Sequence, residues 1–283
     1  MTHAPAAAPA RRGPLWGAQG VALMGVLNVT PDSFSDGGKW FEPEAAVAQA
    51  RRMAGEGADV IDVGGESTRP GAAPVDAAEE QARVRPVVEA LVPTLDAPLS
   101  IDTWRASTAA MALEAGARIV NDVRGFLGDP DIARVVAEHG ADAILMHWES
   151  HEQNPDADIL STVAAGLARS VETALRAGVA EDRLTIDPGI GFGKTPAQNL
   201  ALIAATGALR REFGLPVLIG ASRKRMIAAL LGERSPEARL PATLALHVGA
   251  VLAGADAIRA HDVAPHVDAL RMAQALRDAQ APR

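Results

Sequence analysis

The stretch ALEAGARIVNDV, residues 112–123, contains the pattern that predicts the fold. An Ala-rich amphipathic segment ends at Gly116-Ala117, a short apolar run follows, and the run finishes on the polar residue Asn121. Glycine is a common residue at a helix C-terminus, and the small alanine lets the chain turn into a strand. The stretch therefore predicts a helix, a tight turn and a buried strand with a polar end.

The same arrangement recurs along the chain. The pair Gly-Ala also precedes an apolar run at Gly57-Ala58, Gly140-Ala141 and Gly254-Ala255. Short runs rich in Val, Ile and Leu have the composition of parallel strands that are buried on both faces. They lie at 21–29, 59–63, 98–101, 118–120, 143–146, 184–186, 216–220 and 257–259. Amphipathic stretches between them predict helices at 44–55, 106–115, 131–139, 159–176 and 263–277.

Eight strands that alternate with helices predict an α/β fold of the (β/α)8 TIM-barrel type. An open, doubly wound sheet is the alternative. It would need a Gly-rich phosphate turn after its first strand, and Gly25 lies inside that strand instead. No linker divides the chain, so we expect a flexible tail over residues 1–14 and a single barrel domain over residues 15–283.

The composition of the 283 residues excludes several classes of protein. There is no cysteine, which rules out disulfides, zinc–thiolate sites and a cysteine nucleophile. The net charge of −8 and the 3% aromatic content argue against nucleic acid or an anionic membrane as a partner. No apolar run is long enough to span a bilayer, and the N-terminus lacks the apolar core of a signal peptide. We therefore expect a cytoplasmic protein.

Polar side chains stand at or just after the C-terminal end of every predicted strand. A barrel presents those ends at one face, which is where the active sites of this fold lie. The alternative is that such residues only cap the following helices, a reading that weakens when it must hold for all eight strands. The residues are Asn28, Asp62, Asp102, Asn121, His147, Asp187, Ser222 and the cationic pair Arg259 and His261.

Three loops at this face have the composition of a binding site. The first strand runs into a Pro-, Asp-, Ser- and Gly-rich segment to residue 38, and the second into 64–71. Loops of this kind can close over a substrate, although plain connections are the alternative. After the seventh strand we expect a helix to start near Ser222, so that its N–H groups and Lys224 form a corner that favours anions.

Seven motifs in order resemble those of the dihydropteroate synthase family. They are MGVLNVTPDSFSDGG (24–38), IDVGGESTRPG (61–71), SIDT (100–103), NDVRG (121–125), DPGIGFGK (187–194), SRK (222–224) and RAHDV (259–263). The resemblance covers essentially all of residues 20–275. It implies a pterin-binding barrel enzyme of folate biosynthesis, a transferase that condenses 6-hydroxymethyl-7,8-dihydropterin pyrophosphate with 4-aminobenzoate and releases pyrophosphate.

The resemblance also implies the residues that bind the pterin. The guanidine-like edge of a pterin donates N–H groups, which suits a buried carboxylate that accepts two hydrogen bonds. Asp187 matches that partner, while Asp102 and Asn121 match groups that line the same slot. Lys224 matches the residue that reaches the pterin carbonyl, and Met146 is expected to pack on the face of the ring.

The diphosphate ligands follow by the same resemblance. Arg259 and His261 match groups that bind the diphosphate, with Thr68 beside them. Asn28 is expected to offer its amide oxygen to a Mg2+ ion that binds together with the substrate phosphates. We expect this Mg2+ to bind weakly when the substrate is absent.

The resemblance implies that aminobenzoate binds last, in a pocket that the long loops complete. Thr68, Arg69, Pro70, Phe192 and Ser222 match this pocket. An arylamine is neutral at pH 7, so no strong base is needed, and we expect an SN1-like displacement driven by stabilisation of the leaving group. The carboxylates of the first loop that could support the pterin cation are Asp32 and Asp36. Sulfonamides resemble aminobenzoate and are expected to compete with it.

The chain departs from the family pattern after the fifth strand, where it reads WESHEQNP (148–155). His147, Glu149 and His151 could be imagined as metal ligands there, but their spacing fits no compact site, and packing or a solvated loop is the favoured interpretation. Two other functions are alternatives to the active enzyme. The first is a catalytically silent pterin-binding paralogue. The second is a pterin-dependent methyltransferase, which would lack the loop motifs and the cations of the last strand. The family is commonly dimeric through outer helices, so we expect a homodimer, with the helices near 240–279 as a candidate interface.

Overall fold

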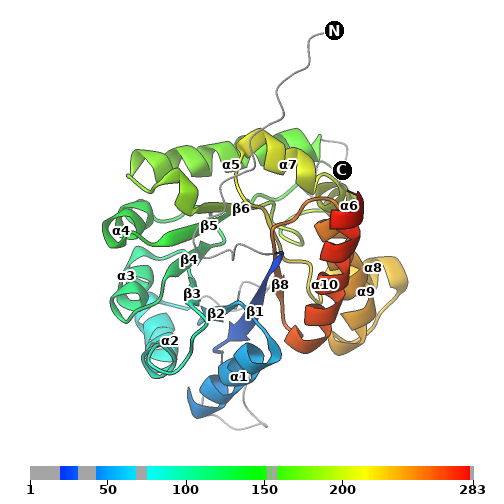
Figure 1. Cartoon of the computed structure of the whole chain (residues 1–283). Helices are drawn as coiled ribbons and strands as arrows, with labels where there is room; N and C mark the ends of the chain where they lie inside the picture. The colour runs from blue at the N-terminus through cyan, green and yellow to red at the C-terminus, as the bar shows by residue number, and fades with distance from the viewer. Residues whose placement is uncertain (1–19, 31–42, 68–74, 152–153, 155–157, 281–283) are drawn as a thin grey trace.

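A computed structural model of the chain describes residues 20–30, 43–67, 75–151, 154 and 158–280. Eight parallel strands stand side by side in the order β6-β5-β4-β3-β2-β1-β8-β7. A parallel bridge between Ile186 and Val217 joins β6 to the segment before β7 and closes the ring (Figure 1). The bounds are β1 Ala22–Asn28, β2 Val60–Gly64, β3 Leu99–Asp102, β4 Ile119–Asp122, β5 Asp142–Met146, β6 Leu184–Asp187, β7 Leu218–Ile219 and β8 Ala257–Ala260. The predicted barrel is confirmed, and the closing bridge excludes the open sheet.

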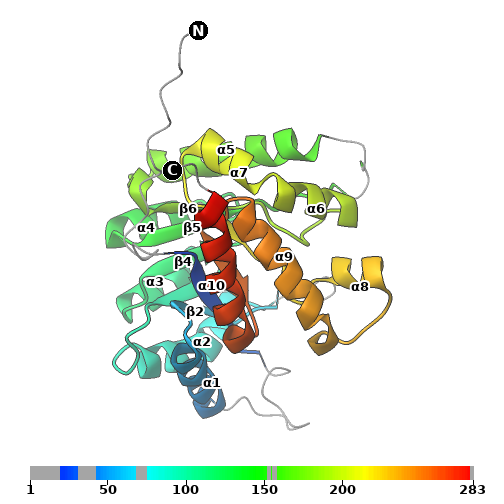
Figure 2. The ribbon, with the colours of Figure 1, turned by 45° about the vertical axis from the view of Figure 1, so that its right-hand side comes forward.

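Helices surround the ring of strands on its outside (Figure 1). Figure 2 shows α9 and α10 side by side, with α8 extending away from the barrel. The helices are α1 Pro43–Glu56, α2 Ala77–Leu91, α3 Ala106–Glu114, α4 Ile132–His139, α5 Ile159–Arg176, α6 Pro196–Ala204, α7 Thr206–Phe213, α8 Arg225–Leu231, α9 Leu240–Leu252 and α10 Val263–Gln280, with short 3-10 helices at Glu181–Arg183 and Glu237–Arg239. Among the residues described here, none of these helices has the length and apolar character needed to cross a membrane.

The Gly-Ala pairs act as the sequence predicts. Gly57, Gly116 and Gly254 have φ angles of 108°, 108° and 110°, and Gly140 has 58°. In all four, the following alanine donates its backbone N–H to a carbonyl in the last turn of the preceding helix, at 2.9–3.1 Å. This hydrogen bond and the left-handed glycine together end the helix and direct the chain into the next strand.

Side chains inside the barrel are arranged in layers because alternate residues of a strand point to the same side. The lower layers form an apolar cluster that we call the barrel floor. It consists of Ala22, Met24, Val60, Ile119, Ile144, Leu218 and Ala257. Two residues later on β2, β4 and β8 the interior becomes polar, with Asp62, Asn121 and Arg259, and this level carries the candidate site.

Two element boundaries differ from the prediction. β7 covers only Leu218–Ile219, not 216–220. α8 begins at Arg225, so Ser222 lies before the helix and not at its first turn. Arg223, between them, has a φ of 58°, and its guanidinium pairs with Asp262 at 3.0 and 2.5 Å. The left-handed turn and this ion pair hold the segment against the loop after β8 and delay the start of the helix.

Candidate active site

Arg259 of β8 is the centre of a buried polar network across the barrel. Its Nε donates to Oδ2 of Asp62 at 2.6 Å, and its Nη2 donates to Oδ2 of Asp102 at 2.7 Å. Asn121 also donates to Oδ2 of Asp62, at 2.9 Å. The other oxygen of Asp62 is buried and has no hydrogen-bond partner in the described part of the chain. The Arg259 side chain remains 21% exposed, so part of its guanidinium is available for a ligand, whereas the Asp62 carboxylate is fully buried.

The charges of this network do not balance, because one guanidinium faces two carboxylates. Burial raises the pKa of Asp102 to about 7, and Asp62 adds to the rise, although Arg259 opposes it. Asp102 therefore holds a proton readily near neutral pH until a cation or an N–H donor approaches. A site with this property gains from binding a ligand that presents donors.

Asp187 lies at the end of β6, beside Met146 at the end of β5 in the strand register. Its side chain is buried, and its Oδ1 accepts the backbone N–H of Gly189 at 2.7 Å. Burial raises the pKa of Asp187, against the opposing effects of that hydrogen bond and of Lys224, Lys194 and Arg259. Asp187 and Met146, both expected to contact the pterin, thus stand side by side at the ends of their strands.

The loop after β6 depends on close backbone approaches. A side chain on Gly189 would lie 2.0 Å from the carbonyl oxygen of His147, and one on Gly191 would lie 2.7 Å from the stem of Lys224. Lys194 is buried, and its ammonium donates to the carbonyls of Gly189 at 3.0 Å and Phe192 at 3.1 Å. Burial lowers the pKa of Lys194 to about 8. This lysine fixes the loop from within and leaves Lys224 to face the site.

Lys224 and Phe192 lie against each other. The Lys224 ammonium is 4.0 Å from the centre of the Phe192 ring, a cation–π contact. The Trp148 ring also packs against Phe192, with the ring centres 5.5 Å apart. Lys224 was expected in the pterin pocket and Phe192 in the aminobenzoate pocket, and the structure places these two residues in contact.

His261 and Ser222 form a pair between the loops after β8 and β7. The Ser222 hydroxyl accepts the backbone N–H of His261 at 3.2 Å and lies 2.9 Å from its Nδ1. Burial lowers the pKa of His261 to about 3, with Arg259, Arg223 and Lys224 adding to the effect. Burial thus favours the neutral form of His261, so that Arg259 is the main cation of the pair expected at β8. If the hydroxyl donates to Nδ1, the hydrogen on Nε2 points to no described acceptor and can donate to an anion.

Two buried histidines connect these same loops from behind. The Ala221 N–H donates to Nε2 of His247 at 3.0 Å, and Nδ1 of His247 lies 2.8 Å from Nε2 of His266. Nδ1 of His266 lies 2.5 Å from the carbonyl oxygen of Asp262. Burial lowers the pKa of His247 well below the usual value, with His266 adding to the effect. If both rings are neutral and carry their hydrogen on Nδ1, all three hydrogen bonds have one donor and one acceptor. This series of hydrogen bonds supports the loops that carry Ser222 and His261.

The first and second loops fall largely outside the described residues. Thr68, Arg69, Pro70, Asp32 and Asp36 are in those parts. The ends of the second loop are described: Glu66 accepts from Arg105 at 2.7 Å and from the Val75 N–H at 3.2 Å, and Arg105 also pairs with buried Glu80 at 3.1 Å. Despite burial, these hydrogen bonds lower the pKa of Glu66. The loop is thus anchored at both ends.

The structure brings together most of the predicted site. Residues at or directly after the carboxyl ends of strands are Asn28, Asp102, Asn121, Met146, Asp187, Arg259 and His261, and Lys224 lies in the loop between β7 and α8. Sequence analysis missed Lys194, Arg105, His247 and His266. Only Lys194 carried a signal, as the last residue of a Gly-rich loop motif. The two histidines sit within Ala-rich helices, where nothing marks them as partners.

Comparison with known proteins agrees with this geometry. Residues 24–261 match the family described as "Pterin binding enzyme". A dihydropteroate synthase of Mycobacterium leprae is 46% identical over 89% of this chain and 92% of its own length. The structure of Xanthomonas albilineans dihydropteroate synthase with 4-aminobenzoic acid superposes with a TM-score of 0.86 and 45% identity, covering 93% of this chain and 94% of that one. The same enzyme in complex with 7,8-dihydropteroate gives a TM-score of 0.83 and 42% identity, covering 93% and 95%. The chain therefore belongs to the pterin-binding enzymes, and among them to the dihydropteroate synthase family.

Proposed function

We propose that the chain uses this site to join 6-hydroxymethyl-7,8-dihydropterin pyrophosphate to 4-aminobenzoate. The amine nitrogen forms a bond to the pterin methylene carbon, the carbon–oxygen bond to the diphosphate breaks, and pyrophosphate leaves with the electron pair. The amine then loses a proton and 7,8-dihydropteroate remains. The observation that carries the proposal is the placement of buried Asp187 on the same barrel mouth as the cations Arg259 and Lys224.

The pterin is assigned to the deep part of the mouth. Asp187 accepts N–H groups from the guanidine-like edge, and Asp102 and Asn121 complete the slot. Donors of the ring favour ionised carboxylates, so binding offsets the burial that raises the pKa values of Asp102 and Asp187. Lys224 reaches the ring carbonyl, and Met146 packs on its face.

The diphosphate is assigned to the side of β8 and β1. Arg259 has donors beyond those it gives to Asp62 and Asp102, and neutral His261 donates from Nε2. Asn28 pairs with Gly64 in the strand register and offers one amide oxygen, a hard ligand that fits Mg2+. A single protein oxygen fits an ion held mainly by the diphosphate. When bound, Mg2+ would neutralise charge that develops on the leaving group.

The aminobenzoate is assigned to the outer part of the mouth. Phe192 lies 4.0 Å from the Lys224 ammonium and therefore borders the pterin slot. Thr68, Arg69 and Pro70 are assigned to this pocket by the family motif, with Thr68 also toward the diphosphate, and Asp32 and Asp36 to support of the cation. Ser222 keeps this assignment through its backbone, because its hydroxyl is engaged with His261. Sulfonamides are expected to compete here.

A homodimer is also part of the proposal. The large apolar side chains of Leu252 on α9, and of Met272 and Leu276 on α10, are exposed. These helices pack against each other on the outside of the barrel (Figure 2). Light scattering on the purified protein should give twice the mass of one chain, and Met272→Glu should reduce it to one.

Pyrophosphate release tests the function. The full chain is given dihydropterin pyrophosphate and Mg2+, with and without 4-aminobenzoate. Release that depends on aminobenzoate and yields dihydropteroate is the expected result. Binding of the pterin ester without release would instead identify a silent pterin-binding paralogue, and no binding would overturn the assignment of the site.

A further inference from the structure

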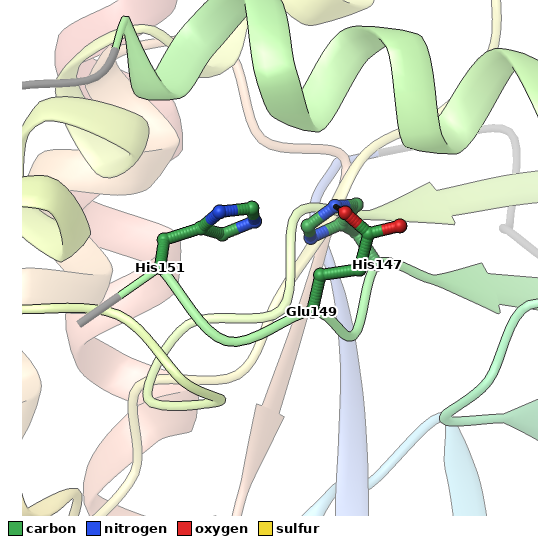
Figure 3. Close-up of side chains that lie close together, drawn as sticks. All are labelled: His147, Glu149 and His151. Atoms are coloured by element: carbon green, nitrogen blue, oxygen red, sulfur yellow. Dashed lines mark ion pairs between the residues drawn. The ribbon is translucent and has the colours of Figure 1, made fainter. Parts of the chain in front are cut away.

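The loop after β5 brings His147, Glu149 and His151 together outside the network already described. One ligand atom from each lies within 4.8 Å of the others (Figure 3). The expectation that their spacing fits no compact site is therefore wrong in geometry. His147 is only 3% exposed, and neither of its ring nitrogens has a hydrogen-bond partner among the described residues, nor has Nε2 of His151. Buried imidazole nitrogens without partners are costly, so a missing ligand is the natural explanation.

The carboxylate of Glu149 completes the donor set. Its Oε2 lies 4.0 Å from Nε2 of His147. The three side chains therefore offer a divalent cation two nitrogen ligands and one anionic oxygen ligand.

The backbone holds the three residues in place. The His147 N–H donates to the Asp187 carbonyl at 2.9 Å, and the His151 N–H donates to the Gly193 carbonyl at 2.5 Å. On α5, Gly166 leaves the space that His147 needs, since a Cβ there would lie 2.3 Å from its ring. The loop after β5 is therefore fixed to the loop after β6 on both sides of Glu149.

We propose that His147, Glu149 and His151 bind one divalent transition-metal ion, with Zn2+ as the best fit, which clamps the loop after β5 to the mouth of the barrel. Two imidazoles and a carboxylate suit Zn2+, whereas Mg2+ and Ca2+ require oxygen ligands. Three protein ligands leave a fourth position for water. The ion would fix Trp148, whose ring packs 5.5 Å from Phe192, and so connect with the outer pocket.

Small movements complete the site. Ligand atoms around tetrahedral Zn2+ lie about 3.3 Å apart, so distances between the ligand atoms, which now reach up to 4.8 Å, must shorten by at most about 1.5 Å. His151 now stacks on His147 at a ring distance of 5.4 Å and must turn toward it. Glu149 pairs with Arg169 through Oε1, which leaves Oε2, 4.0 Å from Nε2 of His147, as its ligand atom. The Glu149–Arg169 ion pair resists movement of the carboxylate little, because the two side chains are 45% and 59% exposed.

The test is direct metal binding by the full chain, free of any purification tag, treated with a chelator and measured without substrate. Calorimetry with Zn2+ should show one ion per chain, and Co2+ should give the intense visible absorption of a four-coordinate site. His151→Gln and Glu149→Gln should each weaken binding at least tenfold. His139→Gln, on α4, and Asn28→Ala should leave it unchanged.

Absence of Zn2+ binding by the unaltered chain would overturn the proposal, as would equal binding by the unaltered chain and His151→Gln. Loss of binding in Asn28→Ala would place the ion at the diphosphate side and also overturn it. Pyrophosphate release is measured in parallel with Mg2+, and Zn2+ binding is measured without substrate, so the outcome for this site stays separate from that of the proposed function.

Discussion

The floor and the mouth of the barrel are built from the same strands and have opposite character. Val60 on β2, Ile119 on β4 and Ala257 on β8 belong to the apolar floor. Two residues further along, the same strands carry Asp62, Asn121 and Arg259, and the last two both donate hydrogen bonds to Asp62. The interior side chains thus change from apolar to polar over one pleat repeat of the strand, which is two residues. On these strands, the position of a residue along the strand decides its role. Lower positions stabilise the barrel, and positions at the carboxyl end contribute to the site.

The two levels also differ in what they contribute to folding. The floor buries apolar side chains and stabilises the barrel. The mouth holds carboxylates whose pKa values burial raises, together with a carboxylate oxygen of Asp62 that has no partner in the described structure. Such groups lower stability until a ligand pairs with them, which is typical of a binding site.

The largest expected effect is at the mouth. Asp187→Asn keeps the size of the side chain and removes its charge, so the affinity for dihydropterin pyrophosphate should fall by about 10^3-fold. Because burial disfavours the charged form of Asp187, the free energy of unfolding should stay the same or rise. Calorimetry and urea denaturation measure the two effects. Retained affinity would remove the pterin role.

A substitution in the barrel floor should have the opposite result, with a loss of stability and little change in binding. Ile144→Ala on β5 removes a fully buried side chain and should lower the free energy of unfolding by about 2–5 kcal/mol. The dissociation constant of the pterin ester should change less than about threefold, since each level acts on its own. A large loss of affinity in a chain that is still folded would show that the two levels are not separable.

Substitutions of Arg259 separate binding of the diphosphate from binding of the pterin within the mouth. Arg259→Gln should weaken binding of the pyrophosphate ester about 100-fold, as loss of one buried charge pair implies. Binding of the free pterin alcohol should fall much less. Arg259→Lys, which keeps a charge near Asp62 and Asp102, should recover part of the ester affinity. Equal losses for the ester and the alcohol would contradict the diphosphate role.

The histidine chain behind the mouth should show a smaller effect. His247→Leu leaves the Ala221 N–H and a ring nitrogen of His266 unpaired and should cost about 1–3 kcal/mol of stability. It should also lower kcat, because Ser222 and His261 lose their support. His247→Gln can accept one bond and donate the other, and it should recover both properties. An equal kcat for the unaltered protein, His247→Leu and His247→Gln would mean that the two histidines have only a structural role.

The smallest expected effect is on the dependence of stability on pH. The lowered pKa values of His147 and His261, about 3, give stability that is present above pH 6.5 and is lost as the pH falls toward 3. Asp102, with a pKa of about 7, acts in the opposite sense, since its contribution falls as the pH rises from about 4 to about 7. When the pH falls from 7.5 to 6.0, Asp102→Asn should therefore lose about 1 kcal/mol more of its free energy of unfolding than the unaltered protein does. Urea denaturation at both pH values checks this, and an unchanged slope would contradict the raised pKa.

The sequence by itself determined the barrel, since repeated apolar runs and Gly-Ala turns are local signals that each specify a strand or a helix end. It also determined which residue types stand at the strand ends, and the family motifs assigned them to substrates. Only the tertiary structure decided the protonation states, because burial and the neighbours of His261 and Asp102 come from distant strands. The same holds for the contact of His247 with His266 and for the approach of His147 to His151. Side-chain distance across a fold depends on packing, and no periodicity along one segment encodes it.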